Sequence, residues 1–174
     1  EIYTFFVVGS VDVYKRQEYA HQSEHGDNPA EFGLDYFSIQ PGITYGPFTL
    51  KLGYEQLDGN GQVGLQTPLA TLHAFNGWAD QFLVTPATGL EDISVDAVFK
   101  PNNVEWLKGT TFRFVYHDFS STTGGVGDYG SEYDALISKK FGKHFTVSAK
   151  YANYQSDGFK VDTEKFWLVL GFKY

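Results

Sequence analysis

The feature that most constrains the fold is a strict alternation of apolar and polar residues at the end of the chain. In the final segment, KFWLVLGFKY, one parity holds Phe166, Leu168, Leu170, Phe172 and Tyr174, and the other holds Lys165, Trp167, Val169, Gly171 and Lys173. Because successive side chains of a strand point to opposite faces, this period of two predicts a β-strand with one apolar face. A chain made of such strands is an all-β protein.

The alternation recurs along the whole chain. Six further strands are predicted within residues 37–45, 48–55, 92–100, 111–117, 132–138 and 145–151, and a weaker one is expected from Val13 to His21. Twelve Tyr, 16 Phe and 19 Gly fit β-structure with tight turns. The absence of Cys excludes a disulfide framework and a Cys-based zinc site. No apolar run approaches the roughly 20 residues that a membrane helix requires.

Two architectures use strands with one apolar face. A soluble β-sandwich turns that face inward, whereas a membrane barrel turns it outward to lipid. Strands of about 10 residues, with Tyr or Phe at their ends, favour an antiparallel transmembrane β-barrel. Its connections alternate between tight turns, at Gly46-Pro47 and Gly142-Lys143, and long segments. The long segments span residues 23–34, 58–90, 120–130 and 155–164, and residues 101–109 are the one longer connection on the short side.

The end of the chain sets an orientation for such a barrel. The strand formed by residues 165–174 looks like the C-terminal signal read by the barrel assembly machinery of the bacterial outer membrane. The short turns are then periplasmic and the long segments extracellular. The long segments are acidic, which predicts a solvated rim or cation-bridged contact with lipopolysaccharide beside the lipid bilayer.

The number of strands leaves two possibilities open. Eight strands could close a small barrel filled with side chains, or they could be the C-terminal part of a wider one. Gly42, Gly53 and Ser148 lie beside charges on the polar parity, which suits a wet wall and favours the larger barrel. Residues 18–174 are assigned to the barrel. Residues 1–17 are given no function, because VDVYKRQ (11–17) resembles a translated sequencing adapter; the alternative is an ordinary strand.

The stretch QTPLATLHAFNGWADQFLVTPATG departs from the strand pattern. A helical period would place Leu69, Leu72, Phe75, Ala79 and Phe82 on one face, with Pro68 at the first helical position. We expect a partly helical extracellular loop, residues 58–90, that is too apolar to extend into water. One hypothesis is that it narrows the lumen, with His73, Asn76, Trp78 and Asp80 as constriction contacts. The alternative is that it packs on the rim as structure only.

Candidate functional residues follow from the barrel prediction. Charges on the polar parity would face the lumen and act on passing solutes. The pore-lining candidates are Lys51, Glu55, Asp96, Lys100, Arg113, His117 and Lys150. No catalytic residue, metal ligand set or cofactor site is predicted, since the five His lack metal-ligand spacing. No basic patch supports nucleic-acid binding.

Several motifs in order resemble the alginate-export-type outer-membrane porins: QTPLATLHAFNGWADQFL (66–83), VYHDF (115–119), YGSEYD (129–134) and SKKFGKHF (138–145). The resemblance implies a channel for passive passage of small hydrophilic solutes, including sugars or uronate oligomers. The mixed charges of the wall depart from the basic lumen of alginate exporters. A structural or adhesive barrel with a plugged lumen is the main alternative. A barrel hydrolase is disfavoured, because a strand places His117 and Asp118 on opposite faces.

Overall fold

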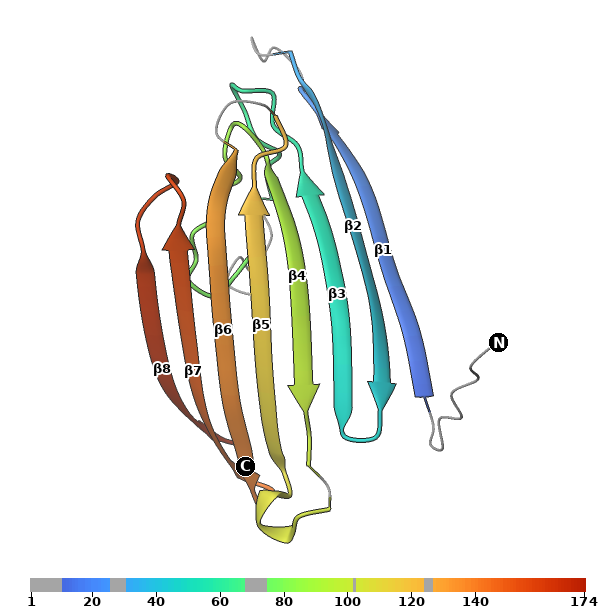
Figure 1. Ribbon diagram of the computed structural model, residues 1–174, viewed down its shortest axis with the longest axis vertical. Coiled ribbons are helices and arrows are strands. Elements are labelled where there is room, and N and C mark those ends of the chain that lie inside the picture. The colour runs from blue at the N-terminus through green and yellow to red at the C-terminus, as the bar shows by residue number, and fades with distance from the viewer. Residues whose placement is uncertain (1–10, 26–30, 68–74, 102, 124–126) are drawn as a thin grey trace, which may run out of the picture.

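Eight antiparallel strands form a single sheet in the computed structural model (Figure 1). The structure describes residues 11–25, 31–67, 75–101, 103–123 and 127–174. The strands are β1 (Val11–Ser23), β2 (Gly33–Tyr45), β3 (Phe48–Leu57), β4 (Leu90–Phe99), β5 (Thr110–Ser120), β6 (Asp128–Phe141), β7 (Phe145–Ser156) and β8 (Thr163–Phe172). The prediction of an all-β chain with eight antiparallel strands is confirmed, and most strands extend a few residues beyond the predicted segments.

The sheet is open. Each strand pairs with its neighbours in the chain, so the order runs from β1 to β8 without a crossover. Among the described residues no backbone pairing joins β1 to β8, and each of these strands has one free edge. Closure of the sheet into a barrel therefore stays a prediction.

The connections differ at the two ends of the sheet, as Figure 1 shows. At one end β2 turns into β3 through Gly46, whose φ of 57° suits a residue without a Cβ. The β6–β7 turn at this end uses Gly142 in the same way, at φ 61°. The third connection here holds a short 3-10 helix, η2 (Glu105–Leu107). The other end carries the long loops, including residues 58–89 between β3 and β4.

The apolar face of the sheet has no second layer over it among the described residues. Leu170 and Leu168 are 76% and 66% exposed, although both belong to the apolar parity of β8. Strand pairing extends this face across the sheet, because partners in register share a face. It includes Phe48, Leu50, Ile93, Phe114, Tyr133, Ile137, Tyr151 and Phe166. A soluble sandwich buries such side chains against a second sheet, whereas among the described residues they are exposed.

The opposite, polar face carries the charges and the buried core. The core cluster combines residues near the long-loop ends of the strands with residues of the β3–β4 loop: Leu34, Leu57, Leu65, Trp78, Ala79, Phe82, Leu90, Val115, Phe119, Tyr129, Ala152 and Tyr154. In Figure 1 this loop descends behind the sheet. The loop therefore supplies a layer that covers part of the polar face.

The expected helical character of the β3–β4 loop is wrong for its described part, residues 58–67 and 75–89. Asn76 and Gly77 have φ values of 50° and 85°, and Asp80 has a φ of 60°. Left-handed residues at these positions interrupt the right-handed repeat that a helix requires. Leu69, Leu72 and Pro68, on which part of the prediction rested, lie outside the described residues. Within the described part of the chain, no helix has the length and apolarity needed to cross a membrane.

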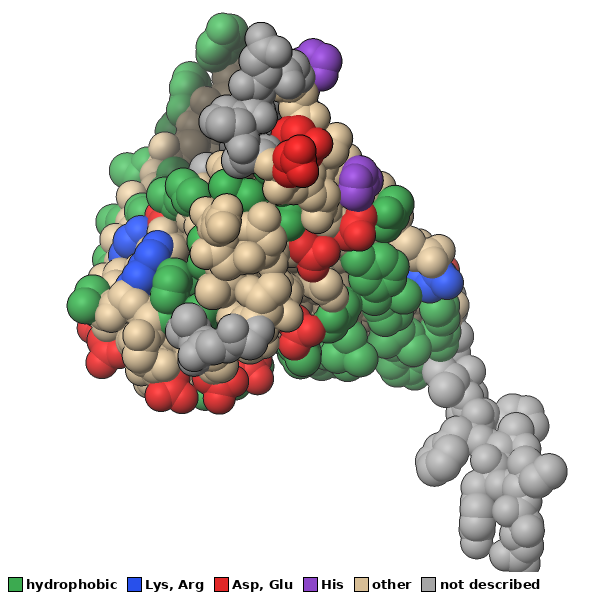
Figure 2. Space-filling model, turned by 90° about the horizontal axis from the view of Figure 1, so that it is seen from above, with side chains coloured by type: hydrophobic (Ala, Val, Ile, Leu, Met, Phe, Trp, Pro, Cys, Tyr) green, Lys and Arg blue, Asp and Glu red, His purple; other side chains and the backbone are tan. Residues whose placement is uncertain are grey.

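Acidic side chains gather at the long-loop end, which Figure 2 views from above. The described acidic residues beyond or near the strand ends there are Glu24, Glu31, Asp58, Asp128, Asp157, Asp162 and Glu164. The acidic long segments identified in the sequence therefore lie together at one end of the sheet.

Candidate functional site

The β3–β4 loop is held on the polar face by two carboxylates of β6. The backbone N–H of Ala79 donates to Glu132 Oε1 at 2.6 Å, and the N–H of Trp78 donates to Asp134 Oδ2 at 3.3 Å. Glu132 and Asp134 are two residues apart on a strand, so both point to the same face. Gly77 lies against the Glu132 carboxylate so closely that a Cβ there would overlap it. The loop path requires a glycine at this contact.

Asn76 fixes the same loop to β3 and β4. Its side-chain amide donates to Glu55 Oε2 at 2.7 Å and to Asp92 Oδ2 at 3.1 Å. Asp92 also contacts His117 Nδ1, at 2.9 Å. The Asn76 amide thus bridges β3 and β4, and the Asp92 carboxylate that it contacts also orients His117 on β5.

The Trp78 ring lies between two cations of the polar face. The Lys150 ammonium is 4.3 Å from the ring centroid and the Arg113 guanidinium is 5.4 Å from it. Arg113 also forms a two-bond pair with Asp96, at 2.9 and 3.1 Å, and Lys51 is 3.7 Å from the same carboxylate. Such fork-shaped contacts fix the guanidinium in one orientation. An aromatic ring of the loop therefore covers a cationic section of the polar face.

An aromatic cluster anchors the loop toward the long-loop end. The Phe82 ring packs against Phe119, Tyr129, Tyr154 and Phe159, with centroid distances of 4.4–6.1 Å. These contacts bury Phe82, and each ring comes from a different strand or loop. This cluster supplies the main apolar attachment of the loop.

Two lysines add polar contacts beside the aromatic cluster. Lys165 of β8 is 2.7 Å from Asp80 Oδ2. Lys160, in the β7–β8 loop, donates to the carbonyl oxygen of Gln81, and burial lowers the pKa of this lysine. The loop thus contacts β3, β4, β5, β6, β7 and β8, which span most of the sheet.

The charges on the polar face separate along the strands. Lys51 and Arg113 lie on the side of the short turns, near Lys150, with Asp96 between them. The carboxylates Glu55, Asp92, Glu132 and Asp134 lie closer to the long-loop end. Asn76, Trp78 and Ala79 occupy the boundary between these two sections.

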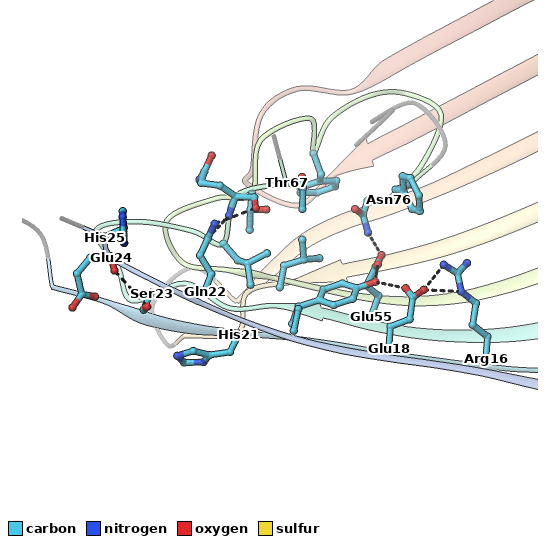
Figure 3. A pocket seen from close by; sticks show the side chains of 18 residues that line it. Arg16, Glu18, His21, Gln22, Ser23, Glu24, His25, Glu55, Thr67 and Asn76 are labelled. Atoms are coloured by element: carbon cyan, nitrogen blue, oxygen red, sulfur yellow. Dashed lines mark hydrogen bonds and ion pairs between the residues drawn. The ribbon is translucent and has the colours of Figure 1, made fainter. Parts of the chain in front are cut away.

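Two cavities adjoin the loop. The larger, about 680 Å³, lies between the loop and strands β1 to β3, and Figure 3 shows Asn76 pointing to Glu55 at its wall. Tyr36 donates to Glu55 at 2.6 Å, and Glu18 pairs with Arg16 at 2.6 Å further along. A smaller cavity, about 170 Å³, extends from Asn76 to Arg113 and His117. The polar face therefore retains open space beside the docked loop.

The structure brings most of the predicted site residues together. Around Asn76 and Trp78 lie five of them: Glu55, Asp96, Arg113, His117 and Lys150. Lys51 joins this cluster through its contact with Asp96, and Asp80 of the loop pairs with Lys165. Lys100 is exposed beyond the end of β4, where its backbone N–H donates to the carbonyl of Pro47. It lies apart from this cluster. His73 falls outside the described residues.

Three carboxylates that accept hydrogen bonds from the loop were not among the predicted site residues. Asp92, Glu132 and Asp134 share the polar parity of their strands, so alternation places them on the correct face. Nothing in their spacing indicates that a segment 16 residues from Asp92, and 53 to 56 residues from Glu132 and Asp134, would supply the donors. The rings of Tyr129, Tyr154 and Phe159 were likewise missed, because they lie at the ends of strands where loops were expected.

The comparisons with known proteins add no identification. No protein-family model, no curated protein and no solved structure matches this chain. The resemblance to alginate-export-type porins thus stays a prediction from the sequence motifs. Among the described residues, no group of three or more His, Asp or Glu side chains is arranged to hold a metal ion.

Proposed function

We propose that this chain forms part of the wall of a bacterial outer-membrane β-barrel channel, with residues 75–83 as its constriction. The channel would pass small hydrophilic solutes such as sugars or uronate oligomers. The observation that carries the proposal is the pairing of an uncovered apolar face with a polar face that is partly covered by a loop. That distribution suits lipid outside and water inside.

The apolar face supports membrane placement by its extent. It crosses the sheet from β2 to β8 with large aliphatic and aromatic side chains that have no protein layer over them among the described residues. Exposed apolar patches that extend across a whole sheet are rare on soluble monomers, and they occur where lipid or a partner covers them. In the proposed orientation the acidic long-loop end faces outward toward lipopolysaccharide. Residues 165–174 would then be read by the barrel assembly machinery.

The free edges of β1 and β8 support a barrel with more strands than these eight. An unpaired edge in hydrocarbon leaves backbone N–H and C=O groups without partners, each costing several kcal/mol. Additional strands between β8 and β1 would satisfy both edges and widen the lumen. A wider lumen would also leave passage beside the docked loop.

A plugged, structural barrel is the second candidate, and one observation favours it. Glu132 and Asp134, the two β6 carboxylates that hold the loop, are fully buried, which indicates a firm attachment to the wall. If the lumen were sealed in this way, the loops at the acidic end would carry the function instead.

Conductance in planar bilayers tests the proposal. The full-length protein should produce discrete channel steps, and shortening residues 69–83 to a glycine-containing turn should increase the step size severalfold. A matched shortening of residues 122–127, in the β5–β6 loop, should leave the step size unchanged. Absence of steps in both the intact protein and the shortened variant would exclude the channel. Steps that appear only in the shortened variant would identify the loop as a plug.

A further inference from the structure

Glu132 and Asp134 have an arrangement that their contacts with the loop do not fully explain. Both side chains are completely buried, at 0% exposure. Each uses one oxygen to accept a loop N–H, and the other oxygens, Glu132 Oε2 and Asp134 Oδ1, have no hydrogen-bond donor. A buried acceptor without a donor is costly, and two neighbouring buried carboxylates also repel each other when both are ionised.

We propose that Glu132 and Asp134 share one proton, and that this proton locks residues 76–80 onto the polar face. The N–H groups of the adjacent residues Trp78 and Ala79 hold the two carboxyl groups side by side on one face of β6. A proton held by one of them forms an O–H that donates to the other. This single proton reduces the charge of the pair from two to one and gives both unsatisfied oxygens a partner.

The groups around the pair come from every neighbouring element. His117 of β5 lies 3.9 Å from Asp134 through Nε2, but its Nδ1 is already engaged by Asp92 of β4. Glu55 of β3 faces the same loop through Asn76, Lys150 of β7 lies over Trp78, and Asp80 of the loop pairs with Lys165 of β8. None of these groups donates a hydrogen bond to the two unsatisfied oxygens.

A proton suits this position better than a metal ion. The described residues contain no group of three or more side chains arranged to ligate a metal. Close packing of Gly77 against the Glu132 carboxylate also leaves little room for an ion with its water ligands. A proton needs no such space.

The sign of the pH dependence follows from the number of bound protons. The docked loop holds the pair in a form with one proton, whereas the same carboxylates exposed to water would lose it in mildly acidic solution. Docking therefore binds a proton, and it weakens as pH rises. In the proposed channel the constriction would be fixed at low pH and released at higher pH. Only this consequence for conduction rests on the proposed function.

Trp78 provides a direct reporter of docking. In a Trp106→Phe, Trp167→Phe background Trp78 is the single tryptophan, and its emission reports whether the ring remains buried beside Lys150 and Arg113. We expect the full chain in detergent to show a loss of buried Trp78 emission as the pH is raised. Detergent measurements do not require a conducting channel, so failure of the latch and failure of the channel are distinguishable.

Glu132→Gln is the decisive variant. The Gln side chain keeps an oxygen for the Ala79 N–H and places an N–H₂ group where it can donate to Asp134. It mimics the protonated pair permanently, so the pH-dependent transition should be lost with Trp78 buried at every pH. Asp134→Asn should behave in the same way. Glu91→Gln is the matched control, because Glu91 lies on the apolar face and bonds to Tyr54 and Ser120. It should keep the normal transition.

Three results would overturn the inference. Glu132→Gln and Asp134→Asn could retain the transition of the unmodified pair. The transition could instead disappear in His117→Gln alone, which would assign it to the histidine. It could also follow the concentration of added Ca²⁺ or a chelator at constant pH, which would assign the space to a metal ion.

Discussion

The two faces of the sheet reverse the distribution expected of a soluble β-protein. On the apolar face Leu168 and Phe166 have no cover among the described residues, whereas on the polar face Glu132 and Asp134 are fully buried beneath a loop. Both sets belong to the same sheet. The difference teaches that, within the described residues, the polar face is the packed side of the sheet and the apolar face is the uncovered side.

The largest effect should come from the apolar attachment of the loop to the polar face. Phe82→Ala removes a buried ring packed against four other aromatic rings, and such truncations cost about 3–5 kcal/mol. The free energy of unfolding in detergent, measured by denaturant titration, should fall by that amount. Phe75→Ala is the matched control in the same loop, because Phe75 is 44% exposed whereas Phe82 is 6% exposed. Equal losses for both variants would mean that the Phe82 cluster does not anchor the loop.

The next effect distinguishes the media on the two faces. Leu168→Arg places a charge on the apolar face, where a bilayer would impose about 2–4 kcal/mol near its midplane. Val169→Arg, one residue later on β8, places the same charge on the polar face. Unfolding from lipid vesicles should be destabilised by Leu168→Arg and scarcely changed by Val169→Arg. Similar free energies for the two variants would show that the apolar face does not contact lipid.

The strands were predictable because alternation is a local property of the sequence. Residues 165–174 alone give the face assignment of β8, and the observed register carries it to β7 through pairs such as Tyr151 with Phe166. The docking of the loop is not local. The hydrogen bond from the Ala79 N–H to Glu132 joins residues 53 positions apart. No periodicity in the sequence predicts which carboxylate accepts which loop N–H.

The predicted site shows the same division. Parity placed Glu55, Arg113 and Lys150 on one face, and the structure brings them around Asn76 and Trp78. The helix predicted for the loop was wrong, because the prediction used only the spacing of apolar residues. The path of the loop is instead set by the left-handed backbone of Asn76 and Asp80. A sequence of this kind reveals which residues share a surface, but not where a loop returns to it.

The smallest effect should come from the ion pair between Asp80 and Lys165, and it measures how wet the polar face is. Both side chains are partly exposed, at 20% and 33%, and the two charged atoms are 2.7 Å apart. Ion pairs that reach water contribute about 0–1 kcal/mol and are weakened by salt. A double-mutant cycle with Asp80→Asn and Lys165→Gln should therefore give a coupling energy within that range, and it should decrease as salt is added. Because removal of one charge from a dry pair costs about 3–5 kcal/mol, a large, salt-independent coupling would indicate a sealed interior. That result would favour the plugged barrel over the channel, whereas a small coupling is what a solvent-filled passage beside the loop requires.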